Sequence, residues 1–282
     1  MITLGLRHLC FIAAATVAAA STAMAADASA WVADVRSGMR LIAGNSPADA
    51  PDGALRAGVE LKLAPGWKTY WRYPGDSGVP PRFDFSQSTN VKTVTVQWPW
   101  PHRFTDGSGN SIGYRDAVIF PFRVVPQDKS QPVNLRLRLE YAVCEKLCVP
   151  VDANAELAVS GSPSTQDAAL TAAEAKVPKP AALNEGKTFA IRAVRRDAAA
   201  GRPRVVVDIM APEYFAVDLF AEGPSSDWAL PLPAVTPGAP AGERRFTFDL
   251  DGLPPGATAA GATLTLTAVG GTGAIEVKAH LD

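Results

Sequence analysis

This 282-residue sequence has little surplus charge, few cysteines and histidines, and few long apolar runs. Lys and Arg number 27 against 28 Asp and Glu, so no basic surplus favours nucleic acid or an anionic membrane surface. A structural zinc site takes four ligands, and no second cysteine pair accompanies Cys144 and Cys148. The 47% of hydrophobic residues and 20% of charged residues then describe a soluble globular protein.

The longest apolar run, residues 9–20, is too short to span a bilayer. Arg7 precedes this run, and Ala23 and Ala25 follow it with small side chains at the positions that a signal peptidase recognises. We therefore predict a signal peptide over residues 1–25, cleaved near Ala25. No transmembrane segment is expected in the exported chain.

Once Cys10 has left with the signal peptide, Cys144 and Cys148 are the only cysteines. Apolar and charged residues alternate over residues 135–143, the period of a half-buried strand, and the continued pattern predicts that Cys144 faces water. Two cysteines four residues apart in an extended strand stand roughly 13 Å apart, but a disulfide needs Cα atoms about 4.4–6.8 Å apart. A sharp turn at residues 145–147 solves this conflict, with a return strand after it and the cysteine pair at the tip or edge of a hairpin.

Three interpretations of this pair remain open from the residues alone. Exported compartments favour disulfides, and a disulfide that closes so short a loop contributes only about 2 kcal/mol to stability, which weakens the purely structural interpretation. Short, exposed disulfides are the labile ones, which favours a redox-active pair. The third interpretation is a Cu(I) site made from the same two thiols.

The remaining pattern predicts an all-β chain with two β-sandwich domains. Short alternating strands occupy residues 28–160 and return in residues 187–282, with almost no helical periodicity between or within them. Residues 161–186 change character, because an Ala-rich segment that can form a short helix is followed by a Pro-rich stretch. We interpret this segment as a linker.

Two aromatic residues of one strand are candidates for the wall of a site. Trp67 and Tyr70 belong to an aromatic-rich strand beside a loop. Phe104 lies between a proline stop and a glycine-rich loop, where an aromatic residue is either an anchor for the loop or a lid, and the residues alone favour the anchor. The loop that contains Ser77 has the letters that surround the nucleophile of chymotrypsin-like proteases. The histidines of the exported chain both come after this serine, so the triad order of that fold is absent and a simple turn is the better interpretation.

Four motifs lie in residues 60–160: Gly66-Trp67-Lys68-Thr69-Tyr70, the Phe104 loop, Tyr114-Arg115-Asp116, and Tyr141 through Cys148-Val149-Pro150. Together they resemble the N-terminal periplasmic domain of the thiol:disulfide interchange protein DsbD and, more closely, the exported regions of ScsB-type copper-tolerance proteins. The three residues between the cysteines are fewer than in DsbD. The second sandwich resembles the extra domain of ScsB-like proteins.

The resemblance implies an immunoglobulin-like fold that carries a redox-active cysteine pair. By position, Cys148 forms the mixed disulfide with a partner and Cys144 resolves it. Phe104 matches the aromatic residue of a cap loop that shields the pair, and Tyr70 matches an active-site tyrosine. Tyr114 comes from the Tyr-Arg-Asp motif and is a further candidate for the wall of the site.

The resemblance also implies a role as a thiol:disulfide oxidoreductase of the protein-disulfide reductase type in the periplasm. Its expected partners are thioredoxin-like or disulfide-isomerase-like proteins and a separate membrane electron donor. No cofactor and no metal are expected. The alternatives are a binding or assembly protein with a structural disulfide and a copper-handling protein.

Overall fold

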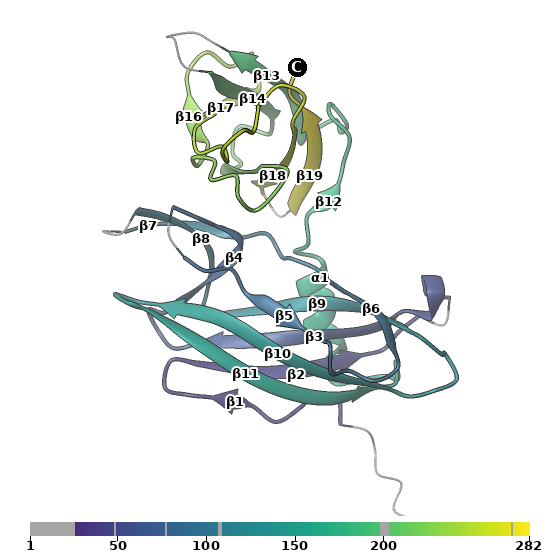
Figure 1. The fold of residues 1–282 in the computed structure, drawn as a ribbon. Helices are drawn as coiled ribbons and strands as arrows, with labels where there is room; N and C mark the ends of the chain where they lie inside the picture. Colours follow the sequence, from purple (N-terminus) through teal and green to yellow (C-terminus); the bar gives the residue numbers. More distant parts are fainter. Residues whose placement is uncertain (1–25, 48, 77, 107–108, 198–202, 272) are drawn as a thin grey trace, which may run out of the picture.

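A computed structural model describes residues 26–282 except 48, 77, 107–108, 198–202 and 272. The predicted signal peptide lies outside these residues. The described chain forms two all-β units (Figure 1), which confirms the predicted fold class of two immunoglobulin-like sandwiches. None of the helices in the described ranges combines the length and the apolar character that crossing a bilayer requires.

The first sandwich packs a five-stranded sheet against a six-stranded one. The five-stranded sheet has the order β1-β2-β3-β9-β6. Its strands are β1 (Val32–Ala33), β2 (Ser37–Gly44), β3 (Leu55–Leu63), β6 (Val91–Val96) and β9 (Ala117–Pro126), with a short 3-10 helix, η1 (Pro51–Gly53), between β2 and β3.

The six-stranded sheet carries the cysteines. Its order is β11-β10-β4-β8-β7, and β5 also pairs with β10. Its strands are β4 (Lys68–Gly75), β5 (Arg82–Asp84), β7 (His102–Asp106), β8 (Gly109–Arg115), β10 (Val133–Cys144) and β11 (Cys148–Val159).

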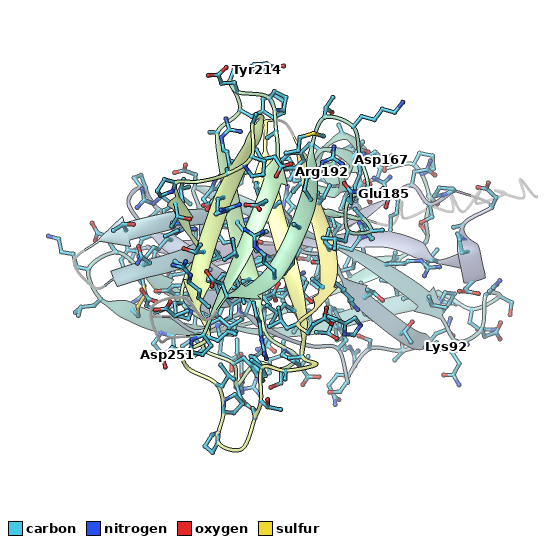
Figure 2. All side chains as sticks on the ribbon, turned by 90° about the horizontal axis from the view of Figure 1, so that it is seen from above. Lys92, Asp167, Glu185, Arg192, Tyr214 and Asp251 are labelled. Carbon is cyan, nitrogen blue, oxygen red and sulfur yellow. A yellow bond between two sulfur atoms is a disulfide. The ribbon has the colours of Figure 1, made fainter. Side chains whose placement is uncertain are left out.

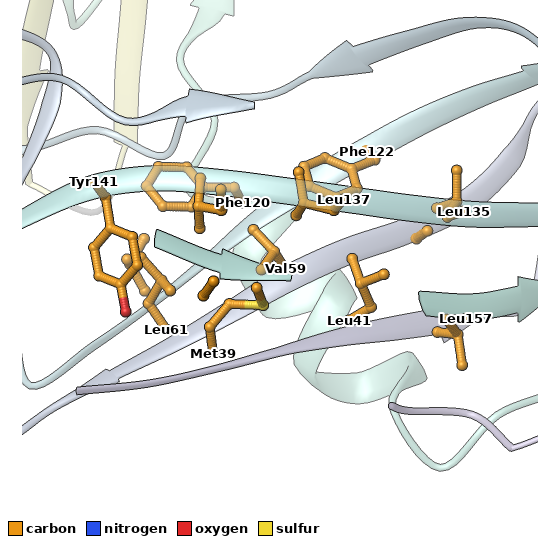
Figure 3. Packing of buried hydrophobic residues seen from close by; sticks show 14 of the residues in the cluster. Met39, Leu41, Val59, Leu61, Phe120, Phe122, Leu135, Leu137, Tyr141 and Leu157 are labelled. Atoms are coloured by element: carbon orange, nitrogen blue, oxygen red, sulfur yellow. The ribbon is translucent and has the colours of Figure 1, made fainter. Parts of the chain in front are cut away.

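The core of the first domain lies between these two sheets. Alternate residues of the facing strands interdigitate there (Figure 3), as the period-2 pattern predicts. Leu41 and Val59 come from one sheet, and Leu135 and Leu137 come from the other; all four are at most 1% exposed. Burial of each such side chain stabilises the fold by roughly 1.5–3 kcal/mol.

The expected linker segment contains one helix, α1 (Asp167–Glu174), which packs against β9 and β2 of the first domain. Leu170 of the helix is fully buried. It packs over Gly58 of β3, where a Cβ would stand only 3.0 Å from the Leu170 side chain. The helix can therefore approach the sheet closely because this position has no side chain. Arg56 holds Glu174 at 2.8 Å.

The second sandwich consists of two four-stranded sheets with their own core. Tyr214 projects from the loop between β14 and β15 into solvent (Figure 2). The strands are β12 (Lys179–Pro180), β13 (Ala190–Asp197), β14 (Arg204–Met210), β15 (Val217–Glu222), β16 (Ala234–Thr236), β17 (Glu243–Asp249), β18 (Thr263–Gly270) and β19 (Gly273–His280).

Candidate functional site

The β10–β11 hairpin brings the two cysteines together. Its strands pair without a shift from Val133 opposite Val159 to Cys144 opposite Cys148, so residues 145–147 form the turn. The cysteine Cα atoms are 4.2 Å apart and a disulfide joins the two side chains. This confirms the predicted turn and return strand.

The two cysteines differ sharply in exposure. Cys148 is exposed, whereas Cys144 is only 3% exposed, so the expectation that Cys144 faces water was wrong. The alternation holds through Glu140, but beyond it β4 pairs with β10 and places Tyr70 over Ala142 and Cys144. A neighbouring strand therefore covers the polar face of the hairpin at its end.

Tyr70 contacts both sulfur atoms. Its hydroxyl donates a hydrogen bond to Cys144 Sγ at 2.7 Å and lies 3.1 Å from Cys148 Sγ. The side chain is 1% exposed, so its ring shields the disulfide from the side of the sheet while Cys148 stays open to solvent. The structure thus places this predicted site residue directly at the disulfide.

The glycine loop after β4 covers the Tyr70 ring. A Cβ built on Gly78 would stand 2.3 Å from Tyr70 Cε1, so the backbone of Gly78 lies flat against the phenol. The loop is tied to the β7–β8 hairpin, because Asp76 accepts hydrogen bonds from the backbone and side-chain nitrogens of Asn110 at 3.1 and 3.2 Å. The sequence predicts a plain turn here, and its glycines are the one signal of a close backbone approach. Ser77 lies outside the described residues.

A buried lysine also lies on the cysteine face of the sheet. Lys68 pairs directly with Cys144 across the strands and is 5% exposed. Its ammonium donates to Ser111 Oγ at 2.9 Å. Sequence reasoning missed both residues as site residues, although Lys68 stands inside one of the quoted motifs.

The other three predicted wall residues lie farther along the sheet or in the core. Phe104 belongs to β7, which is separated from β10 by two strands, β4 and β8, and its ring centroid lies 4.4 Å from the Arg115 guanidinium. Trp67 is half-buried against the main core.

Tyr114 is 4% exposed within that core, and its hydroxyl donates to the Pro99 carbonyl at 2.7 Å. Burial raises the pKa of Tyr114 well above its usual value. Among the predicted residues, the structure thus gathers Cys144, Cys148 and Tyr70.

No group of three or more His, Cys, Asp or Glu side chains suited to a metal ion occurs among the described residues.

An immunoglobulin-like sandwich with a disulfide across the end of one hairpin, half exposed and half covered by a tyrosine, defines a domain of the thiol:disulfide interchange class. Residues 40–160 match the family model described as the N-terminal domain of the thiol:disulfide interchange protein DsbD. The first domain is therefore a DsbD N-terminal-like domain, and the resemblance seen in its motifs is confirmed.

Among solved structures, the chain is similar to the crystal structure of the N-terminal periplasmic domain of ScsB from Proteus mirabilis. The two share 24% sequence identity and superpose with a TM-score of 0.69 over 91% of this chain and 98% of the other. This similarity concerns the fold, and it extends across both sandwiches. A search of curated proteins gave no match.

Proposed function

We propose that this chain is a periplasmic thiol:disulfide exchange module that carries two electrons through Cys144 and Cys148. The observation that carries the proposal is the asymmetry of the disulfide, with Cys148 exposed and Cys144 buried beneath the Tyr70 hydroxyl. An incoming thiolate has access to one sulfur, and the other sulfur is held where a leaving thiolate gains a hydrogen bond.

Electron uptake proceeds in two displacements. A donor thiolate attacks Cys148 Sγ, a mixed disulfide forms, and Cys144 leaves as a thiolate that accepts the Tyr70 hydroxyl hydrogen bond. A second donor thiolate then attacks the donor sulfur of the mixed disulfide and releases Cys148. The donor ends as a disulfide, and this chain holds two thiols after proton uptake.

Delivery reverses the order. The Cys148 thiolate attacks a client disulfide and one client sulfur leaves as a thiolate. Cys144 then attacks Cys148 Sγ and releases the second client thiol. The disulfide of this chain is restored, and the client has gained two electrons and two protons.

A purely structural role fits the hairpin less well. The strands β10 and β11 are each 12 residues long and pair along their whole length, so the hairpin is already closed by backbone hydrogen bonds. The disulfide joins residues with a sequence separation of 4, for which the loop-entropy estimate is about 2 kcal/mol. The first domain has a large core and does not depend on a contribution of that size.

The proposed partners are thioredoxin-like or disulfide-isomerase-like proteins, with a separate membrane protein as electron donor. The hairpin turn supports this proposal because it exposes an apolar side chain next to the reactive sulfur: Leu147 is 79% exposed and directly precedes Cys148. Val79, in the loop that covers Tyr70, is 53% exposed. Exposed apolar side chains of this kind support docking of a protein rather than a small thiol.

Replacement of Leu147 by asparagine, which is polar but uncharged, is expected to weaken docking and to leave the intrinsic chemistry intact. The rate of exchange with a thioredoxin-like protein should fall about ten-fold, the usual effect of losing one apolar anchor, whereas the rate with reduced glutathione should stay within two-fold of the wild type. Leu183→Asn, at another exposed leucine far along the chain, is the matched control and should change neither rate. Equal rates for Leu147→Asn and wild type with the protein partner would remove the turn from the docking surface.

Redox equilibration tests the proposal as a whole. The oxidised protein is incubated in glutathione buffers of graded potential, quenched with acid, alkylated and weighed by mass spectrometry, with circular dichroism recorded in parallel. We expect the disulfide to open within this range while the β-sheet spectrum persists. A disulfide that opens only when the protein unfolds would support a structural bond instead.

A further inference from the structure

Strands β4, β8 and β7 share one face with Cys144, and β4 and β7 contact the second domain from the other side. Residues directly opposite each other in neighbouring strands share a face. Lys68 of β4 pairs with Cys144, and Tyr70, two residues later in the same strand, lies on the same face. Tyr70 pairs with Gly113 of β8, and Ser111, two residues before Gly113, pairs with Phe104 of β7, so these residues also lie on the face of Cys144. The residues next to them point to the rear face of the sheet, and they are Trp71, Ile112 and Arg103.

Arg103 joins β7 to the second domain. Its guanidinium holds Asp218 at 2.7 Å and donates to the backbone carbonyls of Leu219 and Pro233 at 3.3 and 2.9 Å. The pair is partly buried, with 25% and 33% of the two side chains exposed. Charge-assisted hydrogen bonds with several acceptors fix position more firmly than a single surface ion pair does.

Strand β4 is joined to the same domain by an aromatic contact. The Trp71 ring lies 5.7 Å from the ring of Phe220, a residue of β15 that is 1% exposed and belongs to the core cluster of the first domain. Tyr73 donates from its hydroxyl to the Leu230 carbonyl at 2.5 Å. The second domain lies beyond β4, β7 and β8 (Figure 1), on the side where these contacts occur.

An ion-pair cluster adds to this contact. Arg72 holds Glu222 at 2.7 Å and also pairs with Glu276. Burial opposes the charge of Arg72, but the two carboxylates raise the pKa of its guanidinium above the ordinary value. Arg72, two positions after Tyr70, is thus held by two strands of the second domain, β15 and β19.

We propose that the second domain positions the disulfide chemistry of the first: by holding Arg103 and Trp71 from the rear, it fixes β7 and β4 so that the Tyr70 hydroxyl stays aimed at both sulfurs. Arg103 and Asp218 are positioning residues in this sense. The inference rests on the proposed exchange function. Its physical basis is that a hydrogen bond loses strength steeply when its donor shifts or tilts, so a small displacement of β4 weakens both sulfur contacts.

The test is the rate at which reduced glutathione opens the disulfide, because this small probe needs no protein docking. Asp218→Ala should slow opening about five-fold, the lower end of usual coupling between sites. Asp197→Ala is the matched control, since Asp197 pairs with Arg204 at 2.8 Å inside the second domain and its side chain is also 33% exposed. The control should react at the wild-type rate.

A double-mutant cycle with Tyr70→Phe separates positioning from general loosening. If Asp218 acts through Tyr70, Asp218→Ala should slow opening less than two-fold once the hydroxyl is gone. If Asp218→Ala still slowed opening five-fold in the Tyr70→Phe protein, the inference would be overturned. Thermal unfolding is recorded for each variant, and Asp218→Asn, which keeps the side-chain volume, replaces the alanine variant if that one does not fold.

The outcomes also separate this inference from the proposed function. If glutathione leaves the wild-type disulfide closed while the protein is folded, the exchange function fails, and the inference fails with it. If the wild type opens and Tyr70→Phe opens more slowly, but Asp218→Ala matches the wild type, only the role of the second domain is refuted.

Discussion

The Cys148→Ala variant is expected to lose thiol:disulfide exchange completely, whereas Cys144→Ala is expected to form a stable mixed disulfide with a partner. Only Cys148 is exposed, and Cys144 is covered by Tyr70. Without Cys148 there is no accessible sulfur to attack. Without Cys144 the attack succeeds, but no neighbouring thiolate remains to break the bond that forms.

A chromogenic leaving group makes this difference measurable. Cys148 of Cys144→Ala is converted to its mixed disulfide with thionitrobenzoate and mixed with a thioredoxin-like protein that lacks its resolving cysteine. Attack on Cys148 Sγ releases the coloured thionitrobenzoate and leaves a covalent dimer. The same labelling of Cys144 in Cys148→Ala should be at least about ten-fold slower, because access limits the reaction of a buried thiol. Equal labelling and equal crosslinking through both cysteines would contradict the assigned roles.

The Tyr70→Phe variant is expected to slow opening of the disulfide by about ten- to a hundred-fold. The lost hydroxyl contacts Cys144 Sγ at 2.7 Å and Cys148 Sγ at 3.1 Å. A hydrogen bond to a charged group contributes about 1.5–3 kcal/mol, and the Cys144 sulfur gains its negative charge as the bond to Cys148 breaks. Phenylalanine keeps the ring, so the packing against Ala142 and Gly78 is preserved.

Tyr141→Phe provides the control for this substitution. Tyr141 is 3% exposed and its hydroxyl bonds to Ser37 Oγ at 2.9 Å, but it lies on the core face of β10, away from the sulfurs. Its loss should cost about 1 kcal/mol of stability and leave the opening rate unchanged. If Tyr70→Phe opened as fast as the wild type, the tyrosine would only shield the disulfide.

Much of the fold was accessible from the sequence because period-2 alternation is a local signal. The strands of both sandwiches and the turn between Cys144 and Cys148 follow from it, since a residue's neighbours in the chain determine which face it takes. The exposure of Cys144 did not follow. Alternation tells which residues share a face, but the covering residue, Tyr70, comes from a strand far away in the sequence.

The site was partly accessible for a related reason. The family resemblance pointed to Tyr70 because the residue stands in a compact motif, but it also pointed to Tyr114, whose strand turns that side chain into the core. Lys68 and Gly78 carry no periodic signal, and their roles depend on which loop and strand lie beside them. The role of Arg103 was equally hidden, because a single arginine in a strand does not reveal that it pairs with Asp218 of a second domain.

The most direct measurement of the central claim follows the disulfide bond itself from one protein to another. Reduced wild-type protein is mixed with an oxidised thioredoxin-like protein, quenched in acid, alkylated and weighed. The account predicts that the two thiols of this chain disappear as two thiols appear on the partner, while the chain remains folded and loses this ability in Cys148→Ala. Two alkylated cysteines retained on this chain, with the partner still oxidised at equilibrium against a range of such partners, would contradict it.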